Sequence, residues 1–240
     1  MALCTKCQRE LPVSDIKFCP FCGERVNFNA APVAETFTDE RDGETYRLVQ
    51  IGDQIWMAEN LRFNPNAPAY DDDEDNVKNY GRFYSYDETQ GANKVIPKGF
   101  HLPSEEDIQQ LLDYVGANNN DEGVGVSLKS VKGWKYWADN PMDVETGSVK
   151  GTDRFGFRAL PAGYAKKEQY RSSYEYRDLG RVTYFWLEDG GNAYSSIHDN
   201  TLFALSFDRL NRKPIENQNV IEGSRSNFKF SIRCVKDDLD

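Results

Sequence analysis

The clearest chemistry in this sequence lies in the cysteines at its start. Four of the five fall within the first 22 residues, as Cys4, Cys7, Cys19 and Cys22, in the pattern C-x2-C-x11-C-x2-C. A two-residue spacer lets two thiolates converge on one ion, and zinc favours four soft ligands in a tetrahedron. The spacing therefore predicts a structural zinc site held by all four cysteines.

Two other interpretations of the cysteine pattern stay open. The first is iron in a rubredoxin-like site, which fits the tight Cys-Pro-Phe-Cys-Gly turn (the metal knuckle) at residues 19–23. The interval between the two cysteine pairs is, however, short for rubredoxins. A pair of disulfides would need an oxidising compartment. Residues 1–4 contain neither the basic nor the apolar region of a signal peptide. We therefore expect a reducing, cytoplasmic environment and a metal rather than disulfides.

The cysteine segment is predicted to be a small domain of its own. Residues 1–26 resemble a zinc ribbon, and so short a piece cannot build an adequate core. Zinc would then supply most of its folding free energy, on the order of 10 kcal/mol. Residues 27–35 are small, polar and contain proline, which predicts a linker, and residues 36–240 form the main domain.

Charge and hydropathy exclude several classes of function. The chain has 240 residues and a formal net charge of −10, so its field repels nucleic-acid phosphates and anionic membranes. Residues 1–29 carry a formal charge of +1, too little for a ribbon that binds nucleic acid. No stretch approaches the ~18 apolar residues of a membrane span. We expect no nucleic-acid partner and no membrane association.

The sequence of the main domain predicts an α+β fold with mostly antiparallel strands and one clear helix. Ser104 is a predicted N-cap, and apolar residues at helical spacing follow it until Gly116 ends the helix. Turn residues separate short runs that are rich in β-branched and aromatic residues. The expected strands are residues 46–51, 54–57, 155–158, 184–187, 202–205 and 228–234.

An acidic run at residues 71–75 raises the question of calcium. Asp71, Asp73 and Asp75 alternate as in an EF-hand loop, but Asn76 stands where that loop needs Gly, and Arg82 where it needs Glu. We predict a solvated acidic loop and no calcium site.

Four segments together resemble one known family, the Fibrobacter succinogenes major paralogous domain. They are residues 42–61, which include Trp-Met-Ala-Glu-Asn-Leu, and residues 99–104, 156–164 and 230–237, the last of which contains Arg-Cys-Val-Lys-Asp. The resemblance implies a C-type-lectin-like fold, distantly akin to the formylglycine-generating sulfatase-modifying domains. Many members are exported, and some relatives are variable, target-binding proteins of diversity-generating retroelements. The missing export signal departs from the family pattern.

The sequence offers little for catalysis. The sulfatase-modifying relatives use a pair of cysteines, whereas this chain has only Cys234 outside the ribbon, on an apolar strand face where burial is expected. His101 is expected to make a structural hydrogen bond, and His198 has no recognisable nucleophile beside it. The calcium-dependent sugar-binding motifs of C-type lectins do not occur. We expect a protein that is not an enzyme.

Recognition is the function that remains. Tyr, Ser, Asn and Arg are concentrated in the last third of the chain, a composition typical of binding loops. The alternative is that these aromatic residues brace long loops against the sheet. A zinc-ribbon adaptor with the large domain as sensor or spacer is the second functional hypothesis, and the partner is an unknown protein or small ligand. The predicted ligand-binding residues are Tyr170, Tyr174, Tyr176, Trp186, Asn192, Tyr194, His198 and Arg209.

Overall fold

A computed structural model describes most of the main domain and a small part of the cysteine segment. The described residues are 9, 18–23, 35–92, 94–119, 123–135, 151–168, 173–188, 204–208 and 225–237. The linker predicted at residues 27–35 lies outside them, except for its last residue. Within the described chain, no helix is long and apolar enough to cross a bilayer.

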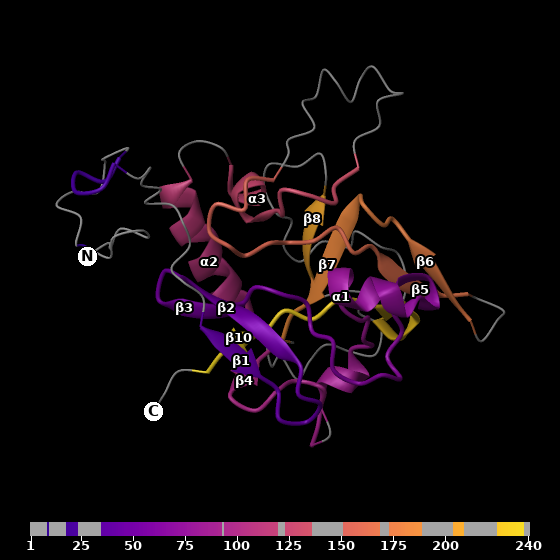
Figure 1. The fold of residues 1–240 in the computed structure, drawn as a ribbon. Helices are drawn as coiled ribbons and strands as arrows, with labels where there is room; N and C mark the ends of the chain where they lie inside the picture. The colour runs from indigo at the N-terminus through magenta and orange to yellow at the C-terminus, as the bar shows by residue number, and fades with distance from the viewer. Residues whose placement is uncertain are drawn as a thin grey trace, which may run out of the picture.

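The fold is α+β, as expected, with three sheets built from short strands (Figure 1). One sheet has five strands in the order β1-β2-β3-β10-β4, a second has the order β6-β5-β9, and the third pairs β7 with β8. Every strand pair in these sheets is antiparallel. The strands are β1 Thr36–Thr38, β2 Thr45–Ile51, β3 Gln54–Met57, β4 Phe100–His101, β5 Tyr164–Lys167, β6 Tyr174–Arg177, β7 Val182–Trp186, β8 Ala204–Asp208, β9 Phe228–Lys229 and β10 Val235–Lys236.

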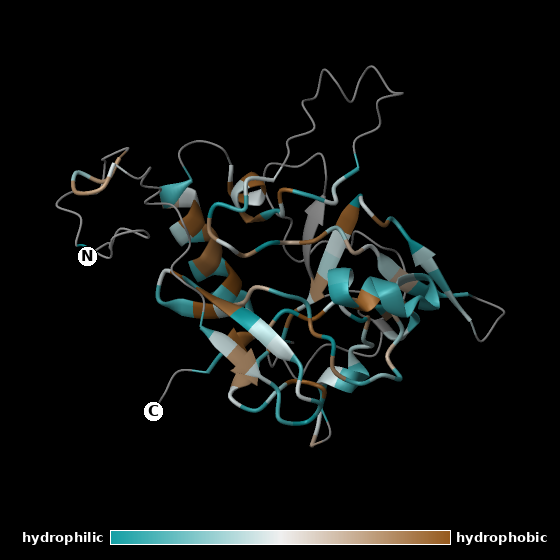
Figure 2. Ribbon diagram, in the orientation of Figure 1, coloured by the Kyte–Doolittle hydropathy of each residue, from teal (hydrophilic) through white to brown (hydrophobic). Residues whose placement is uncertain are grey.

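The predicted helix is confirmed, but it is longer than expected. Helix α2 runs from Glu105–Asn118 and starts with a capping box between Ser104 and Asp107. Its buried residues face the sheet side, and apolar and polar residues alternate along it in Figure 2. Gly116 does not end it, because the side chains of Asn118 and Asn119 bind carbonyl oxygens of the last turn. The helix therefore continues although an interior glycine lowers its stability by about 1 kcal/mol.

The remaining helices are short. Helix α1 is Val77–Tyr80, preceded by 3₁₀ turns η1 Tyr70–Asp72 and η2 Glu74–Asn76, and helix α3 is Val124–Leu128. Two further 3₁₀ turns are η3 Asp87–Thr89 and η4 Arg225–Asn227. Helix α2 contacts both β2 and α3, beside the five-stranded sheet (Figure 1).

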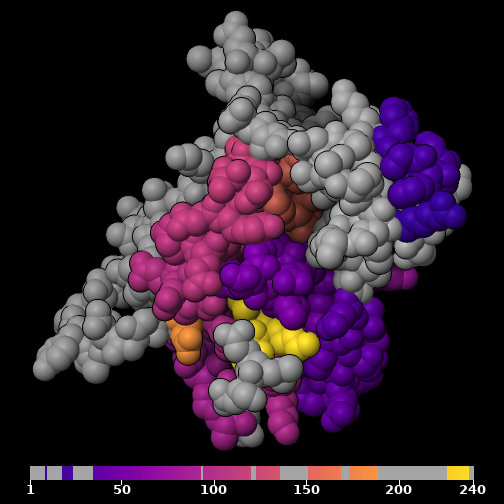
Figure 3. Space-filling view, turned by 90° about the vertical axis from the view of Figure 1, so that its left-hand side faces the viewer, coloured from indigo at the N-terminus to yellow at the C-terminus, as the bar shows by residue number. Residues whose placement is uncertain are grey.

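The C-terminal segment joins all three sheets. It supplies β9 to one sheet and β10 to another, and between them Ser231 forms a bridge with Phe185 of β7. In the space-filling view, the C-terminal residues (yellow) lie between the segment of β2 and β3 and that of β4 and α2 (Figure 3). The strand predicted at residues 228–234 is confirmed only in part, since β9 ends at Lys229 and β10 begins at Val235. Phe228, Phe230, Ile232 and Cys234 are buried as predicted, but Ser231 and Arg233 are buried as well, so burial does not alternate along this segment.

One predicted strand is wrong. Residues 155–158 form a turn in which Gly156 and Arg158 have positive φ angles of 74° and 54°. The carbonyl groups of Phe157 and Arg158 bind the buried Arg233 guanidinium instead of a neighbouring strand. The strand predicted at residues 202–205 begins at residue 204 in the described chain.

Candidate functional site

The described part of the predicted zinc site has the local geometry of a metal knuckle. Residues 20–22 form a turn, the N–H of Phe21 donates to Sγ of Cys19 at 3.4 Å, and Gly23 takes a φ of 69°. Such N–H to sulfur contacts orient the thiolates that hold a metal. Cys19 is buried and Cys22 is half-buried, while Cys4 and Cys7 lie outside the described residues. The described residues therefore fit zinc.

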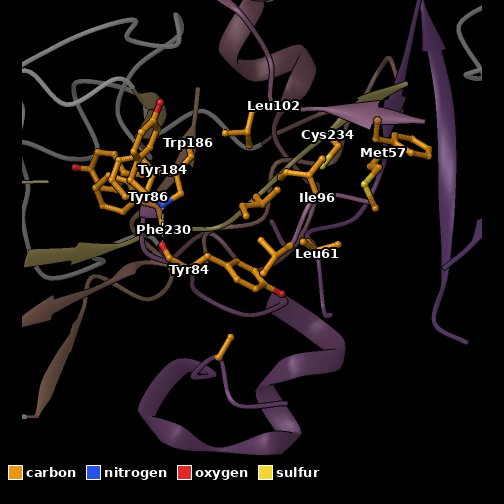
Figure 4. Packing of buried hydrophobic residues seen from close by; sticks show 14 of the residues in the cluster. Met57, Leu61, Tyr84, Tyr86, Ile96, Leu102, Tyr184, Trp186, Phe230 and Cys234 are labelled. Carbon is orange, nitrogen blue, oxygen red and sulfur yellow. Dashed lines mark hydrogen bonds between the residues drawn. The ribbon is translucent and has the colours of Figure 1, made fainter. Parts of the chain in front are cut away.

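The predicted ligand-binding surface needs one correction. Trp186 is 0% exposed, and its indole N–H donates to the carbonyl of Tyr84 at 2.7 Å. It packs against Tyr86 and Phe230 in the larger core cluster, as Figure 4 shows. The residue is a core residue because β7 is covered on both sides, which its sequence neighbours did not indicate. Tyr170, Asn192, Tyr194, His198 and Arg209 lie outside the described residues.

Two predicted binding residues do lie at a surface. Tyr174 and Tyr176 are half-buried on β6, the edge of its described sheet, and alternate with the exposed Glu175 and Arg177. The ring of Tyr176 packs near Tyr70, and its hydroxyl binds Asp72 of the acidic run. The acidic run is thus exposed, as predicted, but one of its carboxylates orders this tyrosine.

His101 is held between two carboxylates. Its Nδ1 lies 2.7 Å from Asp237 Oδ1 and its Nε2 lies 3.2 Å from Asp107 Oδ2. The hydrogen bond with Asp107 contributes most to raising the pKa of His101 to about 9, and the bond with Asp237 adds to this against partial burial. The ring is therefore an imidazolium at neutral pH, a clamp between α2 and the C-terminal segment rather than a general base.

Cys234 is buried, as the sequence predicts. Burial raises the pKa of its thiol to about 12, so the thiolate needed for nucleophilic attack does not form at neutral pH.

Arg233 is the residue that sequence reasoning missed. Its guanidinium is fully buried between the rings of Phe157 and Phe185, and it donates to Asn60 Oδ1 at 2.5 Å. It also donates to the carbonyls of Met57, Phe157 and Arg158. Burial lowers its pKa to about 9, so it stays charged at neutral pH.

These contacts connect the four segments that carry the family resemblance. Arg233 joins residues 230–237 to residues 42–61 and 156–164, and His101 joins them to residues 99–104. The side chains of these motifs are therefore committed to holding the C-terminal segment in the scaffold. The apolar residues of this segment alternate with Arg233, a pattern that predicts an exposed arginine. The pattern does not indicate that other elements cover both faces of the segment.

A polar cleft of about 780 Å³ opens between the β1–β2 turn and helix α1. Its lining carries four acidic and four basic side chains together with amides and no aromatic residue. The charged and amide residues of the lining are Asp42, Glu44, Glu59, Arg62, Asn64, Glu74, Lys78, Asn79, Arg82 and Arg158. The residues come from distant parts of the sequence, so no local pattern could have assembled them. This cleft and the surface of β6, where two half-buried tyrosines lie beside exposed charged residues, are the candidate recognition surfaces of the described chain.

The cleft is stiffened by its own ion pairs. Arg62 donates to Glu44 Oε2 at 2.7 Å and lies over the Tyr46 ring, while Arg82 holds Glu74 through two hydrogen bonds. Burial alone would raise the pKa of Glu59, but hydrogen bonds from Arg47 and the charge of Arg62 outweigh it and lower the pKa.

A family model matches most of the chain. The sequence model of the Fibrobacter succinogenes major domain matches residues 49–236. No curated protein matches the chain, and no solved structure does.

Proposed function

Because the chain belongs to the Fibrobacter succinogenes major domain family, we propose that it is a non-enzymatic binding protein with surface loops on a C-type-lectin-like scaffold. The observation that carries this proposal is β6, where the half-buried Tyr174 and Tyr176 alternate with exposed charged residues at a sheet edge. Rigid rings next to adaptable polar groups are typical of binding surfaces.

In this proposal the motif residues hold the scaffold together and the segments between them bind the ligand. Arg233 and His101 bind other parts of the scaffold, which leaves the segments between the motifs to vary with the ligand. This arrangement suits a protein whose target differs among relatives, including the variable proteins of retroelements. In this proposal the partner is a protein or a small ligand, and the chain acts in the cytoplasm.

The N-terminal segment has a structural role in the proposal. A zinc ion held by Cys4, Cys7, Cys19 and Cys22 would supply the free energy that folds residues 1–26. The turn at residues 20–22 and the N–H contact to Cys19 Sγ support this ligand set.

A second function, in which the ribbon is an adaptor, is favoured by one observation. Phe18 precedes the second cysteine pair, Phe21 lies between its two cysteines, and the two rings are 59% and 51% exposed. Exposed large apolar side chains that lie close together mark interaction sites more often than isolated ones do.

Quantitative affinity capture from a lysate of the source cells separates the two functions. We expect Tyr174→Ala to lose the captured partner, because it removes a surface ring of β6, and Phe21→Ala to retain it. Tyr114→Ala is the matched control, since Tyr114 is an exposed tyrosine on α2. Loss with Phe21→Ala alone would favour the adaptor and contradict the leading proposal.

A further inference from the structure

The carboxylates of the polar cleft already have partners. Glu44 binds Arg62, Glu74 binds Arg82, and Glu59 lies within 3.4–3.7 Å of Arg47, Arg62 and Arg158. Asp42 accepts the N–H of Glu44 within its own turn. The acidic groups of the lining are therefore neutralised or used by the protein itself.

Two cations of the cleft, Lys78 and Arg158, have side-chain N–H groups that donate no hydrogen bond to a described residue. The side chain of Lys78 is exposed on α1 and makes no ion pair with any described residue. Arg158 makes one long ion pair, Nη1 to Glu59 Oε1 at 3.7 Å, and its side chain donates no hydrogen bond to the described part of the chain. The lining is balanced overall, with four acidic and four basic side chains, but Lys78 and Arg158 keep side-chain donors that no described residue accepts.

The fold holds Arg158 in its place at a cost in strain. Its backbone is left-handed, with φ of 54°, a conformation that disfavours residues other than glycine. The Asp153 carboxylate accepts its N–H at 2.7 Å and the buried Arg233 binds its carbonyl. A residue that is held in a strained backbone conformation, and whose side-chain donors line a cleft, is typical of a functional position.

From these contacts we propose that the cleft binds an acidic peptide segment of a protein partner, through its carboxylates, at Lys78 and Arg158. This inference rests on the proposed binding function and adds the chemistry of the ligand. Charge-assisted hydrogen bonds from lysine and arginine to carboxylates are the strong contacts of such a site.

The composition of the lining favours a peptide over other anions. A simple anion would meet the carboxylates of Glu59 and Glu74, whereas the N–H groups of a peptide can donate to their remaining lone pairs. Asn64 and Asn79 offer amides that pair with peptide groups. A saccharide would pack its apolar ring face on an aromatic side chain, and none lines this cleft.

Fluorescence anisotropy on the full chain tests the inference. The probes are fluorescein-labelled eight-residue peptides with two to four Asp or Glu among Gly and Ser, and matched peptides with Lys in the same positions. We expect acidic peptides to bind more tightly than basic ones. Lys78→Gln and Arg158→Gly should each weaken binding about tenfold, the loss of one charged hydrogen bond.

Two controls separate binding from structure. Lys98→Gln removes an exposed lysine outside the cleft and should leave the affinity unchanged. Arg158→Gly relieves the strained φ and should raise the melting temperature by about 2–4 °C. Asp178→Gly relieves a similar φ of 61° outside the cleft lining and should not change binding.

The inference is overturned if acidic peptides bind no better than basic ones, or if Lys78→Gln keeps the affinity. It is also overturned if Arg158→Gly lowers the melting temperature more than Asp178→Gly does, because the Arg158 side chain would then be structural. In the lysate experiment, Tyr174→Ala could abolish capture of the cellular partner while both cleft variants preserve it. That result would refute the cleft as the binding site and leave the proposed binding function standing. Capture unchanged in all of these variants would refute both.

Discussion

Two buried or half-buried cations connect the segments that carry the family resemblance. The guanidinium of Arg233 donates to four backbone and side-chain oxygens in place of water. His101 bridges one aspartate on α2 and one in the C-terminal segment. Both residues could be mistaken for catalytic groups in the sequence. Their contacts instead fix the strand that connects the sheets.

Removal of the Arg233 guanidinium should destabilise the domain strongly. Arg233→Met leaves Asn60 and the bound carbonyls without donors in a buried site, and we expect a loss of about 3–5 kcal/mol in the free energy of unfolding. Arg47→Met is the control, because Arg47 is an exposed arginine paired with Glu59 and should cost less than about 1 kcal/mol. Urea unfolding measures both; similar losses would contradict the role of Arg233.

The clamp at His101 should make stability depend on pH. Its pKa is raised to about 9, so its stabilisation is fully present below the unfolded value of 6.5 and is lost as the pH rises through about 9. We expect about 1–2 kcal/mol after allowance for solvent screening of this partly exposed pair. Melting temperatures at pH 6 and pH 10 should differ less in His101→Ala than in wild type. Equal pH dependence in the two proteins would rule out the clamp.

At the scale of elements, local sequence patterns predicted those helices and strands that local interactions specify. Strands β2 and β3 and the start of α2 were predictable because turn residues, alternation and a capping serine specify them within a few residues. The turn at residues 155–158 was not predictable, since its conformation depends on Arg233, 75 positions later in the chain. Trp186 was misplaced and Arg233 was overlooked for the same reason: burial depends on which distant elements cover a strand.

The β5–β6 hairpin should depend on a glycine that admits a close backbone approach. At Gly163 a Cβ would overlap the carbonyl oxygen of Arg177 in β6, and φ is +71°. We expect Gly163→Ala to cost about 3 kcal/mol or more, whereas Gly43→Ala, with φ of +79° and open space, should cost only about 1 kcal/mol. Thermal unfolding compares them. If the two variants melt together, the close approach is not what requires glycine.

Zinc removal should affect only the N-terminal element. All four tryptophans lie in the main domain, so their fluorescence reports its fold alone. Excess chelator should release about one zinc per chain and open residues 1–26 to proteolysis, while tryptophan fluorescence and the melting temperature of the main domain stay constant. Unfolding of the main domain by the chelator would contradict a separate ribbon.

At the scale of the whole molecule, the scaffold and the recognition surfaces occupy different residues. The motifs meet at Arg233 and His101 inside the fold. Outside it, the cleft exposes polar groups, and β6 exposes Glu175 and Arg177 next to the half-buried rings of Tyr174 and Tyr176. Residues 70–80 connect the two surfaces, because Tyr70 and Asp72 contact Tyr176 while Glu74 and Lys78 line the cleft. One partner could therefore contact both.

Hydrogen–deuterium exchange of the full chain, with and without the captured partner, tests the central claim most directly. The account predicts that the partner slows exchange in residues 164–177 and in the cleft segments at residues 42–45 and 74–82. Protection confined to residues 18–23 would contradict it, because the zinc ribbon would then be the contact surface and the large domain a spacer.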